Sequence, residues 1–231
     1  MKKTTTLINI FLLCGFLMPV TGLAQSLSLV ADYPLIDNLS DITGQNSDMI
    51  LDGETTPPTP PSQGVELCTN GIYILNPNGQ DIQSPIISGF DAEDFLLEME
   101  FRLIALPPGG ANPRYPALMG GTLARWIGVL IDQNGRIGLK YNNSDSNNIW
   151  SNTFIAASPS YHSFMLRYDH GNVDLTINGI SAINTQIPAL EPFQNDFNFT
   201  TTDFSNALSL NGCIRNLKIS STTLIFRDGF E

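Results

Sequence analysis

The chain has 231 residues, and its 22 acidic residues outnumber 11 basic residues to give a formal net charge of −11 at pH 7. An acidic surface of this kind repels nucleic acid and anionic lipid, so the composition argues against proteins that bind either. The acids are scattered singly, as on a solvated surface, and the length suits one domain.

The N-terminus has the three parts of a secretory signal peptide. Lys2-Lys3 precede an apolar run from Leu7 to Val20, and Gly22-Leu23-Ala24 provide small residues at a cleavage site. A proline and a glycine interrupt the run before it is long enough for a membrane anchor. We therefore predict that residues 1–24 are removed, that the mature chain is not inserted in a membrane, and that it is secreted, periplasmic or on the outer cell surface.

The mature chain would retain two cysteines, Cys68 and Cys213. A pair of cysteines in an exported protein favours a disulfide, and closing a loop of about 146 residues would stabilise the fold by roughly 5 kcal/mol. Two buried free thiols are the alternative. A structural metal site is disfavoured because only His162 and His170 accompany the cysteines.

Short alternating segments bounded by Gly, Pro, Asn and Asp run through the chain, and no long helical period is present, which predicts an all-β fold. The clearest strand is 95–103, where Phe95 and every second residue after it are apolar. Its other face carries Glu98, Glu100 and Arg102. We expect the apolar row to face the core.

Residues 125–143 predict a hairpin through Asn134-Gly135, a pair that tolerates positive φ at both central positions of a tight turn. Opposing residues should sum to about 268 or 269. That register sends Ile127 and Val129 to the core side and Trp126 to the other side, which we expect to be available surface.

A second hairpin is predicted over 163–177 through His170-Gly171, with Arg167 opposite Asp174 on the outside. Asn178-Gly179 then turns into a third strand, which makes a meander. Alternation along the predicted last strand, 212–219, puts Cys213 and Ile214 on opposite faces of the sheet. It puts Leu217 and Ile219 on the same face as the cysteine.

These segments together resemble the laminin-G-like or concanavalin-A-like lectin/glucanase jelly rolls, over about residues 27–220. The resemblance implies a two-sheet antiparallel jelly-roll β-sandwich over 25–220, with a tail at 221–231, that serves in carbohydrate binding, protein adhesion or, in some branches, polysaccharide cleavage. The tail, Ile225-Phe-Arg-Asp-Gly-Phe-Glu231, also resembles a terminal motif of exported Gram-negative proteins. The motifs are, in order, Ala31–Asp37, Asp41–Gly44, 95–103, Trp126–Tyr141, Tyr168–Gly171, Asn178-Gly179 and Asn211–Ile219.

A carbohydrate site needs aromatic faces for sugar rings and amide or carboxylate groups for hydroxyls. Such residues gather at one end of the first hairpin, and the loop 142–148 is the best candidate, although Asn and Asp also favour loops that bind nothing. Asp145 with loop carbonyls is a candidate calcium site. The candidate ligand-binding residues are Arg125, Trp126, Asn142, Asn143, Asp145, Asn147, Asn148 and Trp150.

The glucanase branch of the resembling family places carboxylates on alternate residues of one strand, so that two of them flank a glycosidic bond. Glu98 and Glu100 begin such a row, but Arg102 occupies the third position. We therefore expect a non-enzymatic module that binds a glycan or a cell-surface protein. A polysaccharide-cleaving enzyme and an adhesion component without a small ligand are the alternatives.

Overall fold

The computed structural model describes residues 26–36, 38–52, 68, 71–74, 81–106, 114–119, 127–142, 147–190, 197–199 and 212–222. Every regular element within these ranges is a β-strand. The signal peptide, the C-terminal motif and four of the candidate site residues lie outside them. The strands are β1 Leu27–Tyr33, β2 Ile50–Asp52, β3 Ile72–Ile74, β4 Asp81–Gln83, β5 Asp94–Leu103, β6 Arg114–Met119, β7 Ile127–Ile131, β8 Arg136–Tyr141, β9 Asn148–Phe154, β10 His162–Asp169, β11 Asn172–Ile177, β12 Ile180–Gln186, β13 Phe197–Phe199 and β14 Gly212–Thr222.

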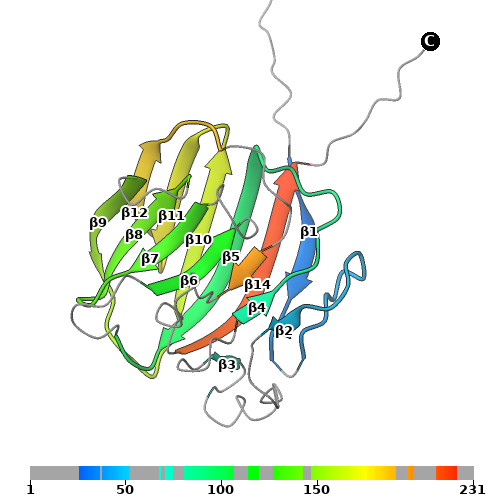
Figure 1. Ribbon diagram of the computed structural model, residues 1–231, viewed down its shortest axis with the longest axis horizontal. Coiled ribbons are helices and arrows are strands. Elements are labelled where there is room, and N and C mark those ends of the chain that lie inside the picture. The colour runs from blue at the N-terminus through cyan, green and yellow to red at the C-terminus, as the bar shows by residue number, and fades with distance from the viewer. Residues whose placement is uncertain are drawn as a thin grey trace, which may run out of the picture.

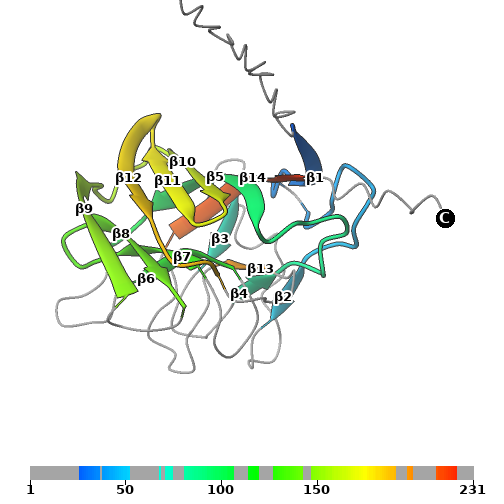
Figure 2. The same ribbon diagram turned by 90° about the horizontal axis from the view of Figure 1, so that it is seen from above.

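The strands form two sheets of seven, all paired antiparallel. Sheet 1 has the order β1-β14-β5-β10-β11-β12, with β3 also paired to β14, and sheet 2 has the order β2-β4-β13-β6-β7-β8-β9. The sheets lie face to face as two layers (Figures 1 and 2). The predicted all-β sandwich is confirmed.

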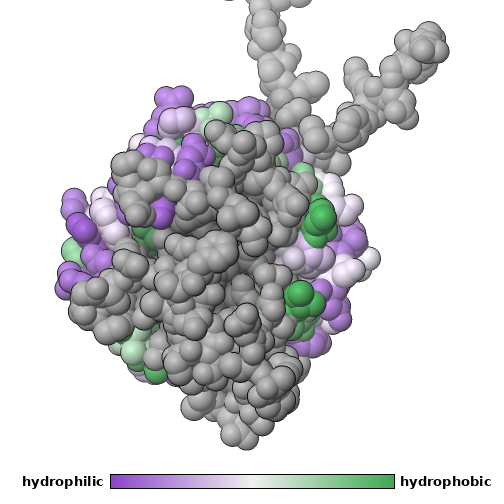
Figure 3. All heavy atoms as spheres, in the orientation of Figure 1, coloured by the Kyte–Doolittle hydropathy of each residue, from purple (hydrophilic) through white to green (hydrophobic). Residues whose placement is uncertain are grey.

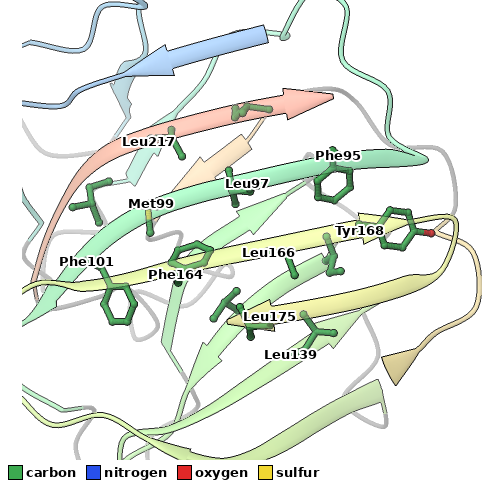
Figure 4. Close-up of a cluster of buried hydrophobic side chains, with 14 of the residues drawn as sticks. Phe95, Leu97, Met99, Phe101, Leu139, Phe164, Leu166, Tyr168, Leu175 and Leu217 are labelled. Atoms are coloured by element: carbon green, nitrogen blue, oxygen red, sulfur yellow. The ribbon is translucent and has the colours of Figure 1, made fainter. Parts of the chain in front are cut away.

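The core lies between the two sheets and is built from alternate residues of each strand. On β5, Phe95, Leu97, Met99, Phe101 and Leu103 are all buried, as the alternation predicts. They meet buried residues of β10, β11, β14 and β8 in the layer between the sheets (Figure 4). Tyr168 shares this layer, and its hydroxyl accepts a hydrogen bond from the backbone N–H of Leu190.

The first hairpin is β7–β8, and its register is the predicted one. Ile127 lies opposite Tyr141 and Val129 opposite Leu139. The turn differs from the expectation, because Gly135 has φ of 80° while Asn134 does not have positive φ. The turn is therefore a three-residue loop, in which the Asp132 carboxylate accepts from the backbone N–H groups of Asn134 and Arg136 at 2.8 and 2.9 Å.

Most of the described outward side of β7–β8 is not available surface, which corrects that part of the prediction, although Arg136 beside the turn is 38% exposed on its side chain and Trp126 lies outside the described residues. Gly128, Leu130, Gly138 and Lys140 point away from the core, and all four are buried; Leu130 is 0% exposed and Lys140 is 4% exposed. We call these four residues the covered face. Gly138 lies against the Trp150 ring, and an added Cβ there would approach the ring to 2.6 Å.

The meander β10–β11–β12 forms as predicted, with Phe164 opposite Ile177 and Tyr168 opposite Val173. Both turns have positive φ at both central residues, at His170-Gly171 and at Asn178-Gly179. Arg167 lies opposite Asp174 in register, but its guanidinium pairs with Asp94 instead. Asp174 accepts a hydrogen bond from the Ser181 hydroxyl at 2.9 Å, so the predicted Arg167–Asp174 ion pair is wrong.

The last strand, β14, contains a bulge that the sequence reading missed. Asn216 has φ of 53°, and the pairing with β5 shifts between Arg215 and Lys218. The extra residue puts Ile214, Leu217 and Ile219 together in the core, while Cys213 faces outward. The predicted phase of Leu217 and Ile219 with the cysteine is therefore wrong.

The predicted disulfide forms between Cys68 and Cys213, with their Cα atoms 5.8 Å apart. Cys213 lies in β14, directly opposite Arg102 of β5. The bond attaches the chain just before β3 to the first residues of β14, which is the end of that strand with which β3 pairs.

The predicted turn at Asp41–Gly44 follows β1 and is closed by the Asp41 carboxylate. This group is 8% exposed and accepts hydrogen bonds from the backbone N–H groups of Asp32, Thr43 and Asn46. Burial acts to raise the pKa of Asp41, but these bonds and those from the side chains of Thr43 and Asn46 outweigh it and lower the pKa. The ionised Asp41 carboxylate thus stabilises the turn after β1 and ties it to that strand.

The described surface is mostly hydrophilic in the view of Figure 3, and the larger green patches lie on the side of β1 and β2. Ile42, Ile50 and Ile86 are among the exposed apolar residues. In the part of the chain that the structure describes, no helix has the length and hydropathy needed to span a membrane.

Candidate functional site

The structure describes half of the predicted rim. Arg125, Trp126, Asn143 and Asp145 lie outside the described residues, so their placement as ligand-binding residues, and Asp145 as a calcium ligand, stays a prediction. Asn142, Asn147, Asn148 and Trp150 are described and lie together, where β8 ends and β9 begins. Across the described ranges, no three His, Cys, Asp or Glu side chains gather as a metal site would require.

Trp150 lies on the outward side of sheet 2, with contacts on its ring. Gly138, opposite it on β8, lies close to the ring, and the Arg136 guanidinium carbon lies 4.6 Å from the ring centroid. Arg136 also forms an ion pair with Asp132, with 3.3 Å between its Nε and a carboxylate oxygen. The ring is half-buried and packed, so a sugar could stack on it only after the arginine moved.

The asparagines at this rim have two unused acceptors. The Oδ1 atoms of Asn142 and Asn148 are buried and have no hydrogen-bond partner. Asn142 has φ of 50°, and Asn147 donates from its amide to the Tyr141 carbonyl at 3.3 Å. Such unpaired carbonyl oxygens suit a ligand that donates hydrogen bonds, as a sugar hydroxyl does.

A second candidate site, which the sequence analysis missed, is a polar pocket on the outward side of sheet 1. Its volume is about 480 Å³, within the size range of small-molecule sites. It lies over β5, β10 and β14, beside the segment that precedes β10. The lining residues are Glu100, Arg102, Pro159, Ser160, Tyr161, Ser163, Asn178 and Arg215. We call this the sheet 1 pocket.

The register of three neighbouring strands builds the pocket floor. Glu100 of β5 lies opposite both Ser163 of β10 and Arg215 of β14, so the three side chains form one outward row. The next outward position on β5 is Arg102, opposite Cys213 of the disulfide. Because these strands are paired on both sides, the charged groups are fixed on a rigid sheet rather than on a loop.

Arg215 is held in place by two contacts. Its Nε donates to the Glu100 carboxylate at 2.6 Å, and its guanidinium carbon lies 3.9 Å from the centroid of the Tyr161 ring. Both partners of the ion pair are partly buried, with side-chain exposures of 26% for Arg215 and 30% for Glu100. A guanidinium with an aromatic ring beneath it and a carboxylate at its edge is pre-oriented for an anion or a hydroxyl.

Arg102 is bound less completely. Its Nε is buried and has no hydrogen-bond partner. Burial raises the pKa of the Tyr161 phenol, and the positive charges of Arg215 and Arg102 act against that rise. Both guanidinium groups are thus close enough to Tyr161 to act on its hydroxyl. The three side chains form one electrostatic unit.

Tyr161 is positioned by a close contact with the chain near the disulfide. An added Cβ on Gly71 would approach the Tyr161 hydroxyl oxygen to 2.2 Å and the Ile214 carbonyl to 3.0 Å. Only glycine leaves room for the phenol at this point. Since Gly71 follows Cys68 closely, the disulfide fixes the segment against which the tyrosine packs.

The carboxylate row that motivates the enzyme alternative is present on the outward side of β5. Glu100 is engaged with Arg215, and Glu98 lies opposite Lys218 of β14 and Met165 of β10. Glu98 and Glu100 thus lie on one face of the strand, and glycoside hydrolysis needs two carboxylates that flank the bond. The described geometry gives Glu100 a structural use, as the group that orients Arg215.

Comparison with protein-family models and with curated protein sequences finds no match to this chain. Solved structures do match its fold. One is domain 4 of an extracellular GH43 arabinanase from Geobacillus stearothermophilus, solved with arabinotriose, which is 16% identical over 85% of this chain and 93% of that domain, with a TM-score of 0.62.

Two larger proteins match in part. Trypanosoma rangeli sialidase, solved with sialic acid, is 13% identical with a TM-score of 0.62, and botulinum neurotoxin type C is 14% identical with a TM-score of 0.57. Each match covers 85% of this chain but only 31% of the chain in the sialidase structure and 48% of the chain in the toxin structure. At these identities the likeness establishes the β-sandwich fold alone.

Proposed function

We propose that this chain is an exported, non-catalytic module that binds carbohydrate in the sheet 1 pocket. The pocket itself carries the proposal: two guanidiniums, an aromatic ring, an amide and hydroxyls converge there on a rigid sheet. Sugar hydroxyls need such fixed donors and acceptors, and the Tyr161 ring serves here to hold the Arg215 guanidinium that lies over it. The partner would be a free glycan or a glycan-bearing surface protein.

The β-sandwich neighbours support this proposal without deciding it. The arabinanase domain was solved with arabinotriose, the sialidase with sialic acid, and the toxin is described as depending on two ganglioside molecules for cell entry. Each of these three proteins is thus described with a sugar or with a lipid that carries one. The non-catalytic part of the proposal rests on Glu100, whose carboxylate is used by Arg215.

The sequence-predicted rim is a second possible place for the same function. Its support is the pair of unpartnered amide oxygens on Asn142 and Asn148. Calcium bound through Asp145 belongs to this version of the proposal. Export by the predicted signal peptide of residues 1–24 applies to both versions.

Glycan-array binding of the mature chain tests the proposal, with calcium present and after chelation. We expect binding that survives chelation and is lost in Tyr161→Ala, which removes the ring under Arg215. Loss in Trp126→Ala or Trp150→Ala instead would move the site to the predicted rim, and loss on chelation would indicate calcium. No binding to any glycan would contradict the proposal and favour an adhesion role through protein contacts.

The enzyme alternative needs a separate measurement. Incubation with polysaccharides, followed by a reducing-end assay, should give no product. Release of oligosaccharides that stops in Glu98→Gln or Glu100→Gln would establish catalysis and overturn the non-catalytic assignment.

A further inference from the structure

We infer that the sheet 1 pocket takes the carboxylate group of an acidic sugar, with Arg102 as its main donor. This inference rests on the proposed function and names the chemical class of its ligand. The first observation is charge: the lining includes Arg102, Arg215 and Glu100, which leaves one positive charge in a protein whose formal net charge is −11. A local cation excess on an acidic protein requires an explanation.

The two arginines are not equivalent. Arg215 has its counter-ion in the Glu100 carboxylate and its apolar surface on Tyr161. Arg102 has a buried Nε that no group accepts from. A buried donor without an acceptor is uncommon in folded proteins, and an acceptor on a ligand that enters the pocket would satisfy it. The excess positive charge therefore resides on Arg102.

The chemistry of the guanidinium selects the ligand. Arginine donates only, and its planar Nε and Nη groups match the two oxygens of a carboxylate. A carboxylate accepts only, so it satisfies Arg102 and supplies the missing negative charge in one contact. A neutral hydroxyl would accept one bond but would leave the charge uncompensated.

The remainder of the pocket suits the rest of a sugar. Ser160 and Asn178 at its border, and Ser163 in its floor, are exposed and carry neutral groups able to exchange hydrogen bonds with hydroxyls. Asn178 is itself fixed in the β11–β12 turn, where its Oδ1 accepts from the Ser163 backbone N–H at 3.0 Å. The pocket thus has a charged floor and a neutral polar border, as a sugar acid has a charged group and a neutral ring.

Its position on the sheet makes Arg102 pre-organised. It sits on β5, between β10 and β14, and directly opposite Cys213 of the disulfide. Little backbone entropy is lost when a ligand binds to such a site, so affinity depends mainly on the contact itself. Arg102 is therefore the residue whose change should separate acidic from neutral sugars.

The test compares sugar acids with their methyl esters, which keep the ring and hydroxyls but lose the charge. Oligogalacturonide and sialyllactose, each with its methyl ester, would be titrated against the mature chain by calorimetry. We expect each acid to bind at least about tenfold more tightly than its ester, the ratio typical of one charged hydrogen-bonded contact. Arg102→Gln should abolish that preference and leave ester binding within about twofold.

Two further variants keep the test decisive. Lys218→Gln removes one positive charge from β14 outside the pocket lining, so it should leave the acid preference unchanged. Arg102→Lys keeps the charge without the planar fork, so it should lose part of the preference even if Arg102→Gln fails to fold. Circular dichroism and thermal melting of each variant would establish that it is folded.

The outcomes separate the two claims. Equal binding of acid and ester by the unaltered protein, or an acid preference that survives Arg102→Gln and Arg102→Lys, would overturn the inference and leave carbohydrate binding standing. A sulfated galacto-oligosaccharide that binds more tightly than both acids, through Arg102, would replace the carboxylate with sulfate and overturn it too. Absence of binding to every glycan, esters included, would overturn the proposed function itself.

Discussion

The outward sides of the two sheets differ, although the sequence patterns that produce them look alike. On sheet 1 the outward residues of β5, β10 and β14 that line the pocket are polar and at least partly exposed; they are Glu100, Arg102, Ser163 and Arg215. On sheet 2 the covered face of β7–β8 is buried throughout, including the lysine at its end, Lys140. Sheet 1 exposes its outward side at the pocket, whereas sheet 2 does not expose the covered face of β7–β8.

The comparison shows what alternation predicts and what it leaves open. Strict alternation identifies the side chains that face the core in both hairpins, but it does not tell whether the opposite side meets solvent. The covered face had a local signal: two of its members are glycines, and Leu130 is apolar on the polar side. Glycines that point outward leave a flat surface onto which another side chain packs, as Trp150 does on Gly138.

Removal of the disulfide should lower the free energy of unfolding more than any other change, and it tests the stability of sheet 1. Cys68→Ser with Cys213→Ser frees a loop whose ends are 145 residues apart, so we expect a loss of about 4–5 kcal/mol in the free energy of unfolding. Guanidinium denaturation measures it, and the unaltered protein with a reductant is the matched control. A change below about 1 kcal/mol would mean that noncovalent pairing of β3 and β14 alone holds this edge.

The two hairpin turns provide the next test, because they have glycines of similar φ in different surroundings. Gly135 has φ of +80°, and an added Cβ would approach the Ile155 carbonyl oxygen to 1.9 Å, whereas Gly179 has φ of +75° and nothing within 4 Å. Gly179→Ala should cost about 1 kcal/mol from backbone strain alone. Gly135→Ala should cost about 3 kcal/mol or more, since the clash adds to the strain.

Chemical denaturation of the two alanine variants separates strain from crowding. Equal losses would mean that the backbone moves freely near Ile155 and that the covered hairpin is not tightly packed at its turn. A larger loss at Gly135 would support the close approach of that turn to the chain after β9.

Most features of this structure that could be predicted from the sequence are formed by residues that lie close together along the chain. The hairpins were predictable because their turns and alternation lie within about ten to twenty neighbouring residues. The disulfide was predictable because only two cysteines remain after the signal peptide. The bulge at Asn216 was not predictable from the sequence. An extra residue only shifts the alternation of apolar and polar residues, and a strand without a bulge can show the same shift.

The sheet 1 pocket was beyond the sequence for a topological reason. Arg215 and Glu100 are 115 residues apart, and they meet because β14 lies beside β5 in the sheet order. The sequence did place Arg102 in the same row as Glu98 and Glu100. There the arginine indicated only that a glucanase site was incomplete, and it did not indicate a pocket. The rim at 142–148 is local in sequence, which is why it could be proposed from the sequence.

A smaller effect should follow from crowding the covered face. An added Cβ on Gly138 would lie 2.6 Å from the Trp150 ring, so Gly138→Ala must displace the indole and should cost about 1–3 kcal/mol. In a Trp126→Phe background, Trp150 is the remaining tryptophan, and its emission should shift red as the ring becomes more exposed. Glu98→Ala, on the open face, is the control and should cost less than about 0.5 kcal/mol.

The smallest effect concerns the β10–β11 turn of sheet 1, where the His170 side chain is 64% exposed. The hydrogen bond between its Nδ1 and the Asp169 carboxylate, at 2.8 Å, raises the pKa of His170, and the slight burial of the ring opposes this weakly. A raised pKa in the folded state means that the protonated histidine stabilises the fold at pH values below its unfolded pKa. That contribution is lost as the pH rises through the folded pKa, and solvent screening keeps it small. An NMR titration of the imidazole should therefore give a lower pKa in Asp169→Asn than in the unaltered chain. Identical titrations would mean that the exposed pair in the β10–β11 turn does not persist in solution, unlike the Asp132 carboxylate of the β7–β8 turn, which two backbone N–H groups hold in place.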